Sequence, residues 1–347
     1  MGAEYLLNIY RPCLFGAFIL ALLGTFSGCR QRNPRPEVVV YTSVDQVNAE
    51  PVLKEFARRS GILVRPVFDV EASKTTGLAN RIAAEKARPQ ADVFWNNEFV
   101  QTLRLKSERL LAPSQPQGSE SLPADLRDPD GYWYASGARF RVILANTKRL
   151  KPGERPQKLE DFATDKVPAK DLAIAMPLFG TSAAQAAALY ATLGEEKARG
   201  LYTRLRDRGV RVVDGNAVVR DLVSQGSVAA GWTDSDDACG ALERGAGVEI
   251  ILPDQDAGGT LMIPATVAEV AGAPHPKEAL ALMEFLLQPA TEKMLIDSGF
   301  FQMSVREGGP ASACLGGRPV RTMHISLPEI GARLETSRRD MSVLFNR

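Results

Sequence analysis

A regular alternation of short strands and helices between residues 37 and 111 is the feature that most constrains the fold. Three runs rich in β-branched and aromatic residues are typical of buried strands, at 38–43, 62–68 and 91–95. Amphipathic helices are predicted to follow them, over 51–60, 74–86 and 99–111. Because the connections are short, these elements predict a parallel sheet with right-handed crossovers.

The alternation starts again after a polar, proline-rich excursion at residues 113–130. Further strands are predicted at 140–146, 171–176, 210–213, 228–233, 248–252 and 260–268. Further helices are predicted at 183–193, 195–208, 216–224, 239–244, 276–287, 289–296 and 328–345. Two arrays, each with its own strands, predict an α/β fold with two lobes, which suits a chain of 347 residues.

Two of the predicted strands, near residues 140 and 262, are placed to connect the lobes. If they form the hinge, the first lobe is discontinuous and the chain returns to it after the second of these strands. We therefore assign residues 37–138 and 265–310 to lobe 1, and residues 139–264 and 311–347 to lobe 2. The net charge of +1 and the lack of a basic run predict no nucleic-acid partner.

Three carboxylates, Asp234, Asp236 and Asp237, lie within four residues where a predicted strand ends and a helix begins. One acidic residue at such a place commonly caps the helix or interacts with its dipole. Three exceed what one cap needs, and like charges so close repel each other unless something neutralises them. The cluster therefore either serves its helix or faces a metal ion or a cationic ligand group, together with Asp45 after the first strand.

Other polar residues also follow the carboxyl ends of predicted strands, where open α/β sheets bind their ligands. We predict ligand contacts from both lobes, at Ser43, Asp45, Asn97, Thr181, Ser182, Asn216, Thr233, Asp234, Ser235, Asp236 and Asp237. Thr181 or Ser182 is the expected N-cap of the following helix. The free N–H groups and hydroxyls at this helix start and at Asn216 accept an anion, or these residues serve only as caps and turns.

Five aromatic residues lie near the same loop ends: Tyr41, Trp95, Trp133, Tyr134 and Trp232. They either pack in the core or contact an ammonium group through a cation–π interaction. For Trp232, which lies inside a predicted strand, we favour core packing. The sequence has no nucleophile elbow, phosphate-binding loop or paired-histidine motif, so it predicts binding without catalysis and without a catalytic cofactor.

The N-terminus has the layout of an export signal. Arg11 precedes an apolar run at residues 13–25, which is too short for a comfortable membrane span. The run ends in Phe-Ser-Gly before Cys29, which resembles a bacterial lipobox with this cysteine as the lipidation site. We assign residues 1–28 to a lipoprotein-type signal peptide and residues 29–36 to a proline-containing tether. An ordinary signal peptide or an uncleaved anchor is the alternative, and each predicts work outside the cytoplasm.

Two further cysteines, Cys239 and Cys314, lie far apart in the sequence. Export permits a disulfide between them, but two buried free thiols agree with the sequence equally well. The chain has only two histidines, His275 and His324, and no Cys-x-x-Cys motif, so zinc-type ligation is not expected.

Several segments resemble the ferric-iron-binding proteins of bacterial ABC importers, which belong to the type II periplasmic solute-binding proteins. The resembling segments are spread over residues 37–305, at 38–43, 61–64, 91–95, 139–146, 180–182, 259–261 and 274–287. The resemblance implies two α/β lobes with mixed sheets, joined by two hinge strands and closing on a ligand in the cleft between them. It also implies a periplasmic monomer, here anchored to a bacterial membrane by lipid, that passes its ligand to a permease driven by a cytoplasmic ATPase.

The residues that hold iron in this family are replaced here. Asp45 stands where the family has a histidine, and Asn97 stands where it has a glutamate. Ser235 and Asp236 stand where it has two consecutive tyrosines. The fold and the transport role are therefore implied more strongly than the iron ligands.

The family's anion-holding loops match this sequence better, at Ser182, Ala183 and Asn216. The resemblance thus implies ferric iron or another metal as ligand, on Asp45, Asp234, Asp236 and Asp237, with a synergistic phosphate or carbonate. A cationic or zwitterionic solute, such as a polyamine or 2-aminoethylphosphonate, is the alternative ligand. An extracytoplasmic sensor domain is the alternative role, and the sequence leaves the permease and the anchoring membrane open.

Overall fold

The computed structural model describes residues 35–69, 76–317 and 319–345. The first array follows the predicted order of strands and helices. Its elements are β1 (Glu37–Thr42), α1 (Gln46–Ser60), β2 (Leu63–Phe68), α2 (Thr76–Ala84), β3 (Val93–Asn96), α3 (Val100–Ser107) and β4 (Leu111–Ala112). β1 pairs in parallel with both β2 and β3, as expected for strands that are joined by helices.

The start of α1 differs from its prediction. The helix begins more than one turn before Pro51, because the amides of Asn48 and Ala49 already bond to the carbonyl of Asp45. Gly61 ends the helix in a left-handed conformation with φ of 72°, as its position predicts. The early start places Asp45 directly at the N-terminus of α1.

The end of α3 also differs from its prediction. The helix stops at Ser107, and Arg109 adopts a positive φ of 60°, which a continuing helix does not allow. Leu111 therefore enters β4, which pairs with a strand from much later in the chain.

The second array also alternates strands and helices, and its strands form a second sheet. Its elements are β5 (Tyr134–Asn146), β6 (Leu172–Ala175), α4 (Gly180–Leu193), α5 (Glu195–Arg208), β7 (Arg211–Val213), α6 (Asn216–Ser224), β8 (Ala230–Asp234), α7 (Ser235–Glu243) and β9 (Val248–Ile251). The chain then continues through β10 (Met262–Val270), α8 (Pro276–Leu286) and α9 (Pro289–Asp297), and ends in α10 (Leu327–Gly331) and α11 (Leu334–Phe345).

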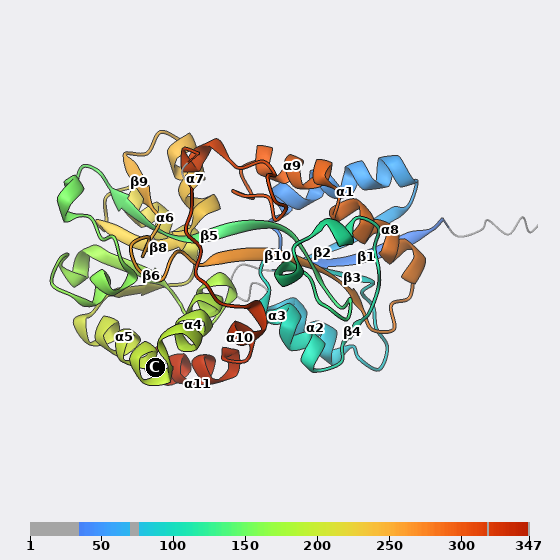
Figure 1. Cartoon of the computed structure of the whole chain (residues 1–347), viewed down its shortest axis with the longest axis horizontal. Helices are drawn as coiled ribbons and strands as arrows, with labels where there is room; N and C mark the ends of the chain where they lie inside the picture. Colours follow the sequence, from blue (N-terminus) through green and yellow to red (C-terminus); the bar gives the residue numbers. More distant parts are fainter. Residues whose placement is uncertain (1–34, 70–75, 318, 346–347) are drawn as a thin grey trace, which may run out of the picture. The chain divides into compact units, whose positions relative to one another are not determined.

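The long strand β5 belongs to both sheets. Its first half pairs with β10, and its second half pairs with β8 and β9. The strands therefore hydrogen-bond in the order β2-β1-β3-β10-β5-β8-β6-β7. In Figure 1, β5 and β10 run side by side between β1–β3 and β6–β9. The fold is thus a mixed α/β fold with two lobes, and the predicted strands near 140 and 262 lie side by side, as β5 and β10, between β3 and β8.

Two of the apolar clusters centre on different sheets. One is built on β1, β3 and β10 and includes the buried side chains of Trp95 and Phe94. A second packs on the other sheet around Trp232, whose ring lies 5.2 Å from that of Phe162. Burying a large apolar side chain stabilises a fold by about 1.5–3 kcal/mol, so both clusters stabilise the fold. The predicted core position of Trp232 is confirmed.

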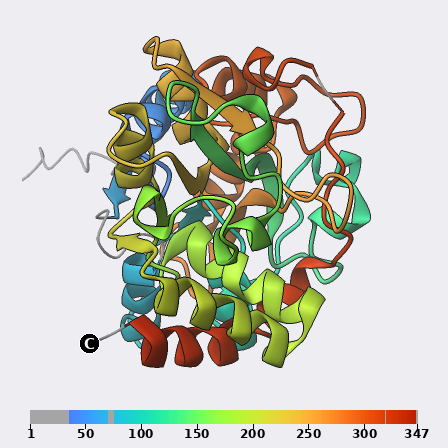
Figure 2. The same cartoon turned by 90° about the vertical axis from the view of Figure 1, so that its left-hand side faces the viewer.

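The C-terminal segment forms two helices where one was predicted. The break follows Gly331, where a Cβ atom would lie 2.8 Å from Leu103 of α3. α10 packs against both α3 and α4, whereas α11 packs against α4 and α5, as Figure 2 shows for the red helix. Because α10 contacts elements of both arrays, the predicted lobe boundary at residue 311 stays a prediction.

A disulfide joins Cys239 of α7 to Cys314, with the two Cα atoms 5.7 Å apart. The sequence left this pairing open, and the structure decides it in favour of a cross-link. The bridge ties the helix that carries Asp236 and Asp237 to the segment before α10.

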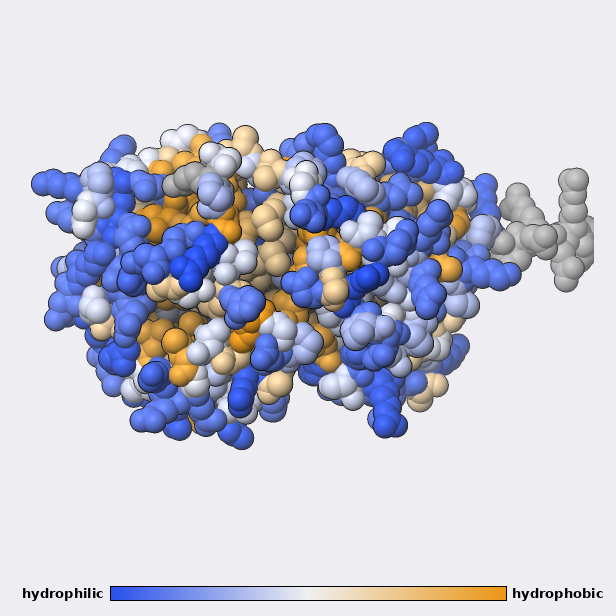
Figure 3. Space-filling view, viewed as in Figure 1, coloured by the Kyte–Doolittle hydropathy of each residue, from blue (hydrophilic) through white to orange (hydrophobic). Residues whose placement is uncertain are grey.

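Hydrophilic side chains cover much of the face shown in Figure 3, with apolar patches between them. Within residues 35–69, 76–317 and 319–345, no helix has both the length and the apolar character that a membrane span requires. The predicted signal peptide, the tether as far as Pro34 and the lipidation site Cys29 lie outside the described residues.

Candidate ligand-binding site

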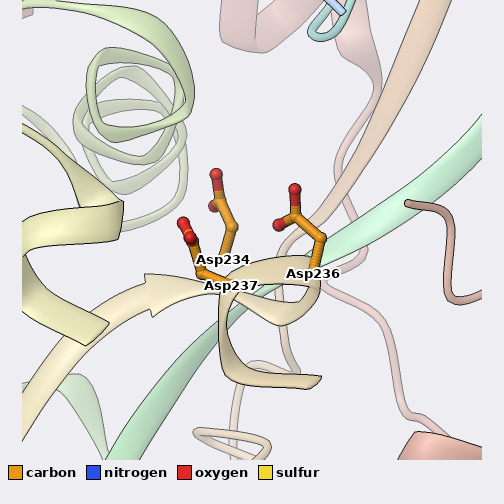
Figure 4. Close-up of side chains that lie close together, drawn as sticks. All are labelled: Asp234, Asp236 and Asp237. Carbon is orange, nitrogen blue, oxygen red and sulfur yellow. The ribbon is translucent and has the colours of Figure 1, made fainter. Parts of the chain in front are cut away.

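The acidic cluster lies at the junction of β8 and α7. Asp234 ends the strand, and Asp236 and Asp237 lie in the first turn of the helix. One oxygen from each of the three carboxylates lies within 4.8 Å of the others. Figure 4 shows all three side chains pointing to the same side of this junction. The strand-to-helix turn therefore gathers the carboxylates as the sequence predicted.

Three arginines neutralise much of this charge. Arg141 of β5 lies 2.6 Å from Asp234, and Arg139 of the same strand lies 2.9 Å from Asp236. Arg220 of α6 lies 2.8 Å from Asp237. The sequence interpretation missed these partners. A signal was present, because two arginines two residues apart interrupt an otherwise apolar strand and so point to one face of it.

Asp234 is the most fully bonded member of the cluster. Its carboxylate accepts hydrogen bonds from Arg141 at 2.6 Å, from the Thr181 hydroxyl at 2.7 Å and from the Asn216 amide at 3.1 Å. Burial alone would raise the pKa of Asp234, but Arg141 and Arg139 outweigh it and hold the pKa below its usual range. Asp234 therefore fastens β8 to the starts of α4 and α6.

Arg139 connects groups from both lobes. Its Nη2 donates to the backbone carbonyl of Asn97 at 2.7 Å, while its Nη1 donates to Asp236. Burial would lower the pKa of this guanidinium, but Asp236 and Asp234 outweigh it and raise the pKa. Asn97 is itself held by Ser43, whose hydroxyl accepts from the Asn97 amide at 2.9 Å.

Two buried polar atoms in this network have no hydrogen-bond partner among the described residues. They are Oδ1 of Asp236 and Nε of Arg139. Burial raises the pKa of Asp236, and the charges of Asp234 and Asp45 add to this effect despite the proximity of Arg139. A buried acceptor without a partner is destabilising. A cation or a hydrogen-bond donor in the cavity would remove that penalty.

A cavity of about 130 Å³ adjoins the network, lined by residues of both lobes. Eight of the predicted ligand contacts line it: Asp45, Asn97, Thr181, Ser182, Asn216, Asp234, Asp236 and Asp237. Other residues that line the cavity were not predicted, among them Arg139, Arg220, Met176, Phe179 and Asp214. Ligand sites for drug-sized molecules measure about 300–1,000 Å³, so this cavity suits a small ion or solute.

Four predicted contact residues do not line the cavity but support its walls. Ser43 bonds to Asn96 and Asn97, and Thr233 donates to the carbonyl of Asn216. Ser235 accepts from the amide of Phe140 and donates to Gln302, and Ala183 packs in the apolar cluster built on β1, β3 and β10.

The starts of α4 and α6 face the cavity, but the cap of α4 differs from the prediction. Phe179 occupies the N-cap position of α4, so Thr181 and Ser182 lie inside the first turn instead. Their hydroxyls bond to Asp234 and Asn216. Helix N-termini leave N–H groups free for an anion, and these two helix starts lie on the same cavity.

None of the five aromatic residues singled out from the sequence lines this cavity. The guanidinium of Arg81 instead lies over the ring of Tyr41, 4.7 Å from the ring centre, and the Tyr41 hydroxyl donates to Glu85. Trp95, Trp133 and Tyr134 are buried. Core packing, the first of the two interpretations of these aromatics, is the one that the structure supports.

The sequence is similar to several bacterial binding proteins. It is 25% identical to iron uptake protein A1 of Synechocystis sp. over 276 residues, which cover 76% of this chain and 74% of that protein. It is 26% identical to the major ferric iron-binding protein of Neisseria gonorrhoeae, over 56% of this chain and 57% of that protein. It is also 26% identical to a putative 2-aminoethylphosphonate-binding periplasmic protein of Salmonella typhi, over 77% of this chain and 79% of that protein.

Solved structures share the fold at lower identity. The ferric binding protein from Campylobacter jejuni superposes with a TM-score of 0.82 at 20% identity, covering 89% of this chain and all of that chain. The periplasmic binding protein AfuA from Actinobacillus pleuropneumoniae, with fructose-6-phosphate bound, gives a TM-score of 0.77 at 20% identity, covering 89% of this chain and 98% of that chain.

Two α/β lobes joined by paired strands, with a small polar cavity lined from both, define a two-lobed solute-binding protein. Residues 88–312 match the model of the bacterial extracellular solute-binding protein family. The chain belongs to this family, and its predicted membership among solute-binding proteins of this type is confirmed. It therefore works outside the cytoplasm as a binding protein for a small solute or ion.

Proposed function

We propose that this chain is the substrate-binding component of an ABC importer, which captures ferric iron or another hard metal ion together with a small anion. The observation that carries the proposal is the buried Oδ1 of Asp236, which has no hydrogen-bond partner among the described residues. Asp236 lines a cavity together with Asp45 and Asp237. Carboxylate oxygens are the ligands that hard cations prefer.

The two halves of the ligand would contact different walls of the cavity. Asp45, Asp236 and Asp237 would hold the metal, while Asp234 keeps the helix starts in place through its hydrogen bonds. The N-termini of α4 and α6 would hold a phosphate or carbonate. The cavity of about 130 Å³ is in keeping with an ion and a small oxyanion rather than a bulky chelate.

Relatives support both the cargo and the transport role. The proteins from Synechocystis and Neisseria are named for iron uptake and ferric iron binding. We propose that residues 37–138 and 265–310 close against residues 139–264 and 311–347 by bending at β5 and β10. The closed form would then dock on a permease and release its cargo.

A zwitterionic solute is the second candidate. It is favoured by the pairing of Asp234, Asp236 and Asp237 with arginines, because such a site already balances much of its negative charge. An amine would face Asp236, and a phosphonate would face the helix starts. The relative from Salmonella is named for 2-aminoethylphosphonate.

Calorimetric titration of the purified mature protein decides between these cargoes. The probes are ferric nitrilotriacetate with and without phosphate, Mn²⁺, 2-aminoethylphosphonate and spermidine. We expect the tightest binding for ferric ion in the presence of phosphate, and no turnover of any probe. Tighter binding of 2-aminoethylphosphonate would support the second candidate, and turnover of a phosphate ester would contradict a pure binding role.

Two variants test the site. Asp236→Asn should weaken binding of the best probe by at least about tenfold, which corresponds to about 1.4 kcal/mol. The matched control is Asp207→Asn, which removes an equal charge from an exposed residue of α5 and should leave the affinity unchanged. Equal affinity of both variants and the wild type would mean that the cargo does not contact Asp236.

Lipid anchoring and the monomeric state complete the proposal. In the full-length chain, Cys29→Ser should abolish incorporation of labelled fatty acid and release the protein from membranes. Membrane attachment that survives this change would favour an uncleaved anchor. Light scattering of the soluble form should give the mass of a monomer.

A further inference from the structure

Arg220 and Asp237 form an ion pair on the wall of the cavity. Arg220 lies in α6 and Asp237 in the first turn of α7, and both residues line the cavity. Nη1 of Arg220 lies 2.8 Å from an oxygen of Asp237, and its Nε lies 2.8 Å from an oxygen of Asp221. The side chains of Arg220 and Asp237 are 21% and 16% exposed, so water screens this pair only in part. The pair therefore ties α6 to α7 at the cavity.

Each member of the pair suits a different half of the proposed cargo. Asp237 offers carboxylate oxygens, which hard cations prefer. Arg220 offers a planar guanidinium, which binds phosphate oxygens through two parallel N–H donors. Arg220 also lies one helical turn after Asn216, the first residue of α6, so both residues lie on the same face of this helix. The guanidinium is thus placed close to the helix start that would hold the anion.

We propose that Arg220 couples the cation to the anion by exchanging partners. In the structure Arg220 pairs with Asp237. When the cargo binds, Asp237 turns to the metal ion and Arg220 turns to the oxyanion. The inference rests on the proposed function, since it concerns the same cavity. It goes further by assigning to one ion pair the means by which each half of the cargo promotes binding of the other half.

The coupling follows from a thermodynamic cycle. A metal ion alone has to compete with Arg220 for Asp237, and an anion alone has to compete with Asp237 for Arg220. When both bind, the ion pair is broken only once, so each raises the affinity for the other by the same factor. A partly exposed ion pair accounts for a factor of up to about fivefold, which corresponds to about 1 kcal/mol.

Three variants and one control test the exchange. Arg220→Gln removes the cation that competes for Asp237, Asp237→Asn removes the carboxylate that competes for Arg220, and the double variant removes both. The control is Arg206→Gln, which removes an equal charge from an exposed arginine of α5 that pairs with its neighbour Asp207. Each protein is titrated with Mn²⁺ and with ferric nitrilotriacetate, both with and without phosphate, and with phosphate alone.

We expect the two single variants to change the affinities in opposite directions. Arg220→Gln should raise the affinity for metal without phosphate by about threefold to fivefold and weaken the binding of phosphate alone. Asp237→Asn should weaken the binding of metal and raise the affinity for phosphate alone by about threefold to fivefold. Both variants should lower the coupling factor, which is the factor by which phosphate raises the affinity for metal. Arg206→Gln should leave all these quantities unchanged.

The double variant separates partner exchange from a general change in charge. Exchange predicts that the coupling factor falls no further in the double variant than in either single variant, because one pair has only one coupling to lose. Direct contact between metal and anion also couples them, but it is common to all the proteins and cancels when they are compared. Losses that add in the double variant would overturn the inference. A similar loss of affinity for every probe in Arg220→Gln, which a merely structural arginine would give, would overturn it as well.

If Arg220→Gln does not fold, Asp237→Asn alone keeps the test decisive. Partner exchange requires tighter binding of phosphate alone together with a smaller coupling factor in this variant, and any other result would overturn the inference. A wild-type protein that binds neither metal would instead contradict the proposed function, so the two failures are distinguishable.

Discussion

Replacing Asp234 with asparagine separates a structural role of this carboxylate from a direct role in ligand binding. Asp234 is 3% exposed and accepts hydrogen bonds from Arg141, Thr181 and Asn216, while Arg139 lies 3.5 Å away. Asparagine keeps one acceptor oxygen but removes the charge that faces two buried guanidinium groups. Breaking a buried ion pair costs about 3–5 kcal/mol, so we expect the free energy of unfolding to fall by about 3 kcal/mol.

The matched control is Asp237→Asn, in the first turn of the helix that follows Asp234. Its partner Arg220 keeps a second carboxylate, Asp221, at 2.8 Å, and both Asp237 and Arg220 are partly exposed. The expected loss is therefore about 0–1 kcal/mol. Urea-induced unfolding followed by tryptophan fluorescence gives both values, because the buried Trp232 adjoins the cluster in β8. Two-lobed proteins can unfold in more than one step, so the lobes are fitted as separate transitions.

The reasoning is refuted by one combination of results. If the free energy of unfolding of Asp234→Asn lies within about 0.5 kcal/mol of the wild-type value, the hydrogen bonds and ion pairs of Asp234 do not stabilise the second lobe. If ligand affinity nevertheless falls at least about tenfold, Asp234 is a direct ligand, as the sequence alone suggested. Adding Arg141→Gln to the variant should recover part of the lost stability if an uncompensated charge is the cause.

Two further predictions concern the rest of the fold. Cys239→Ser with Cys314→Ser removes a cross-link between residues 75 positions apart, and the chain-entropy model puts its stabilising effect at about 4 kcal/mol. A reductant should therefore lower the urea midpoint of the wild type but not that of the double variant. An equal response of the two proteins would contradict the disulfide. Burial and the hydrogen bond to a neighbouring glutamate raise the pKa of Tyr41 to about 12. Because the folded state holds this proton more tightly than the unfolded state, the stabilising effect is complete below pH 10 and is lost as the pH rises towards 12. Unfolding free energies measured from pH 9 to 12 should thus fall more steeply for the wild type than for Tyr41→Phe, and parallel curves would argue against the shift.

Most elements of the fold could be predicted because their signals are local. β-branched runs such as 38–43 and 91–95 became β1 and β3, and Gly61 ended α1 as expected. Two of the errors fall where distant contacts decide the outcome. Leu111 pairs with β10, and the tail breaks after Gly331 where it packs against α3. No local pattern contains that information.

The candidate site could be predicted only in part, for the same reason. That Asp234, Asp236 and Asp237 lie at one edge of a sheet follows from the rule that strand ends carry the functional loops. Which of them is free to bind does not follow from that rule. The carboxylate of Asp234 is already paired with Arg141, which lies 93 residues earlier in the chain.

Local sequence was therefore sufficient for the α/β alternation, the two lobes and the acidic turn, because period and composition act over a few residues. Tertiary structure alone decided the arginine partners of the acidic cluster, the disulfide and the supporting role of Ser43 and Ser235. The physical reason is that electrostatic energy and cross-linking depend on distance through space. Arg139 and Asp236 are 97 residues apart in the chain and 2.9 Å apart in the fold.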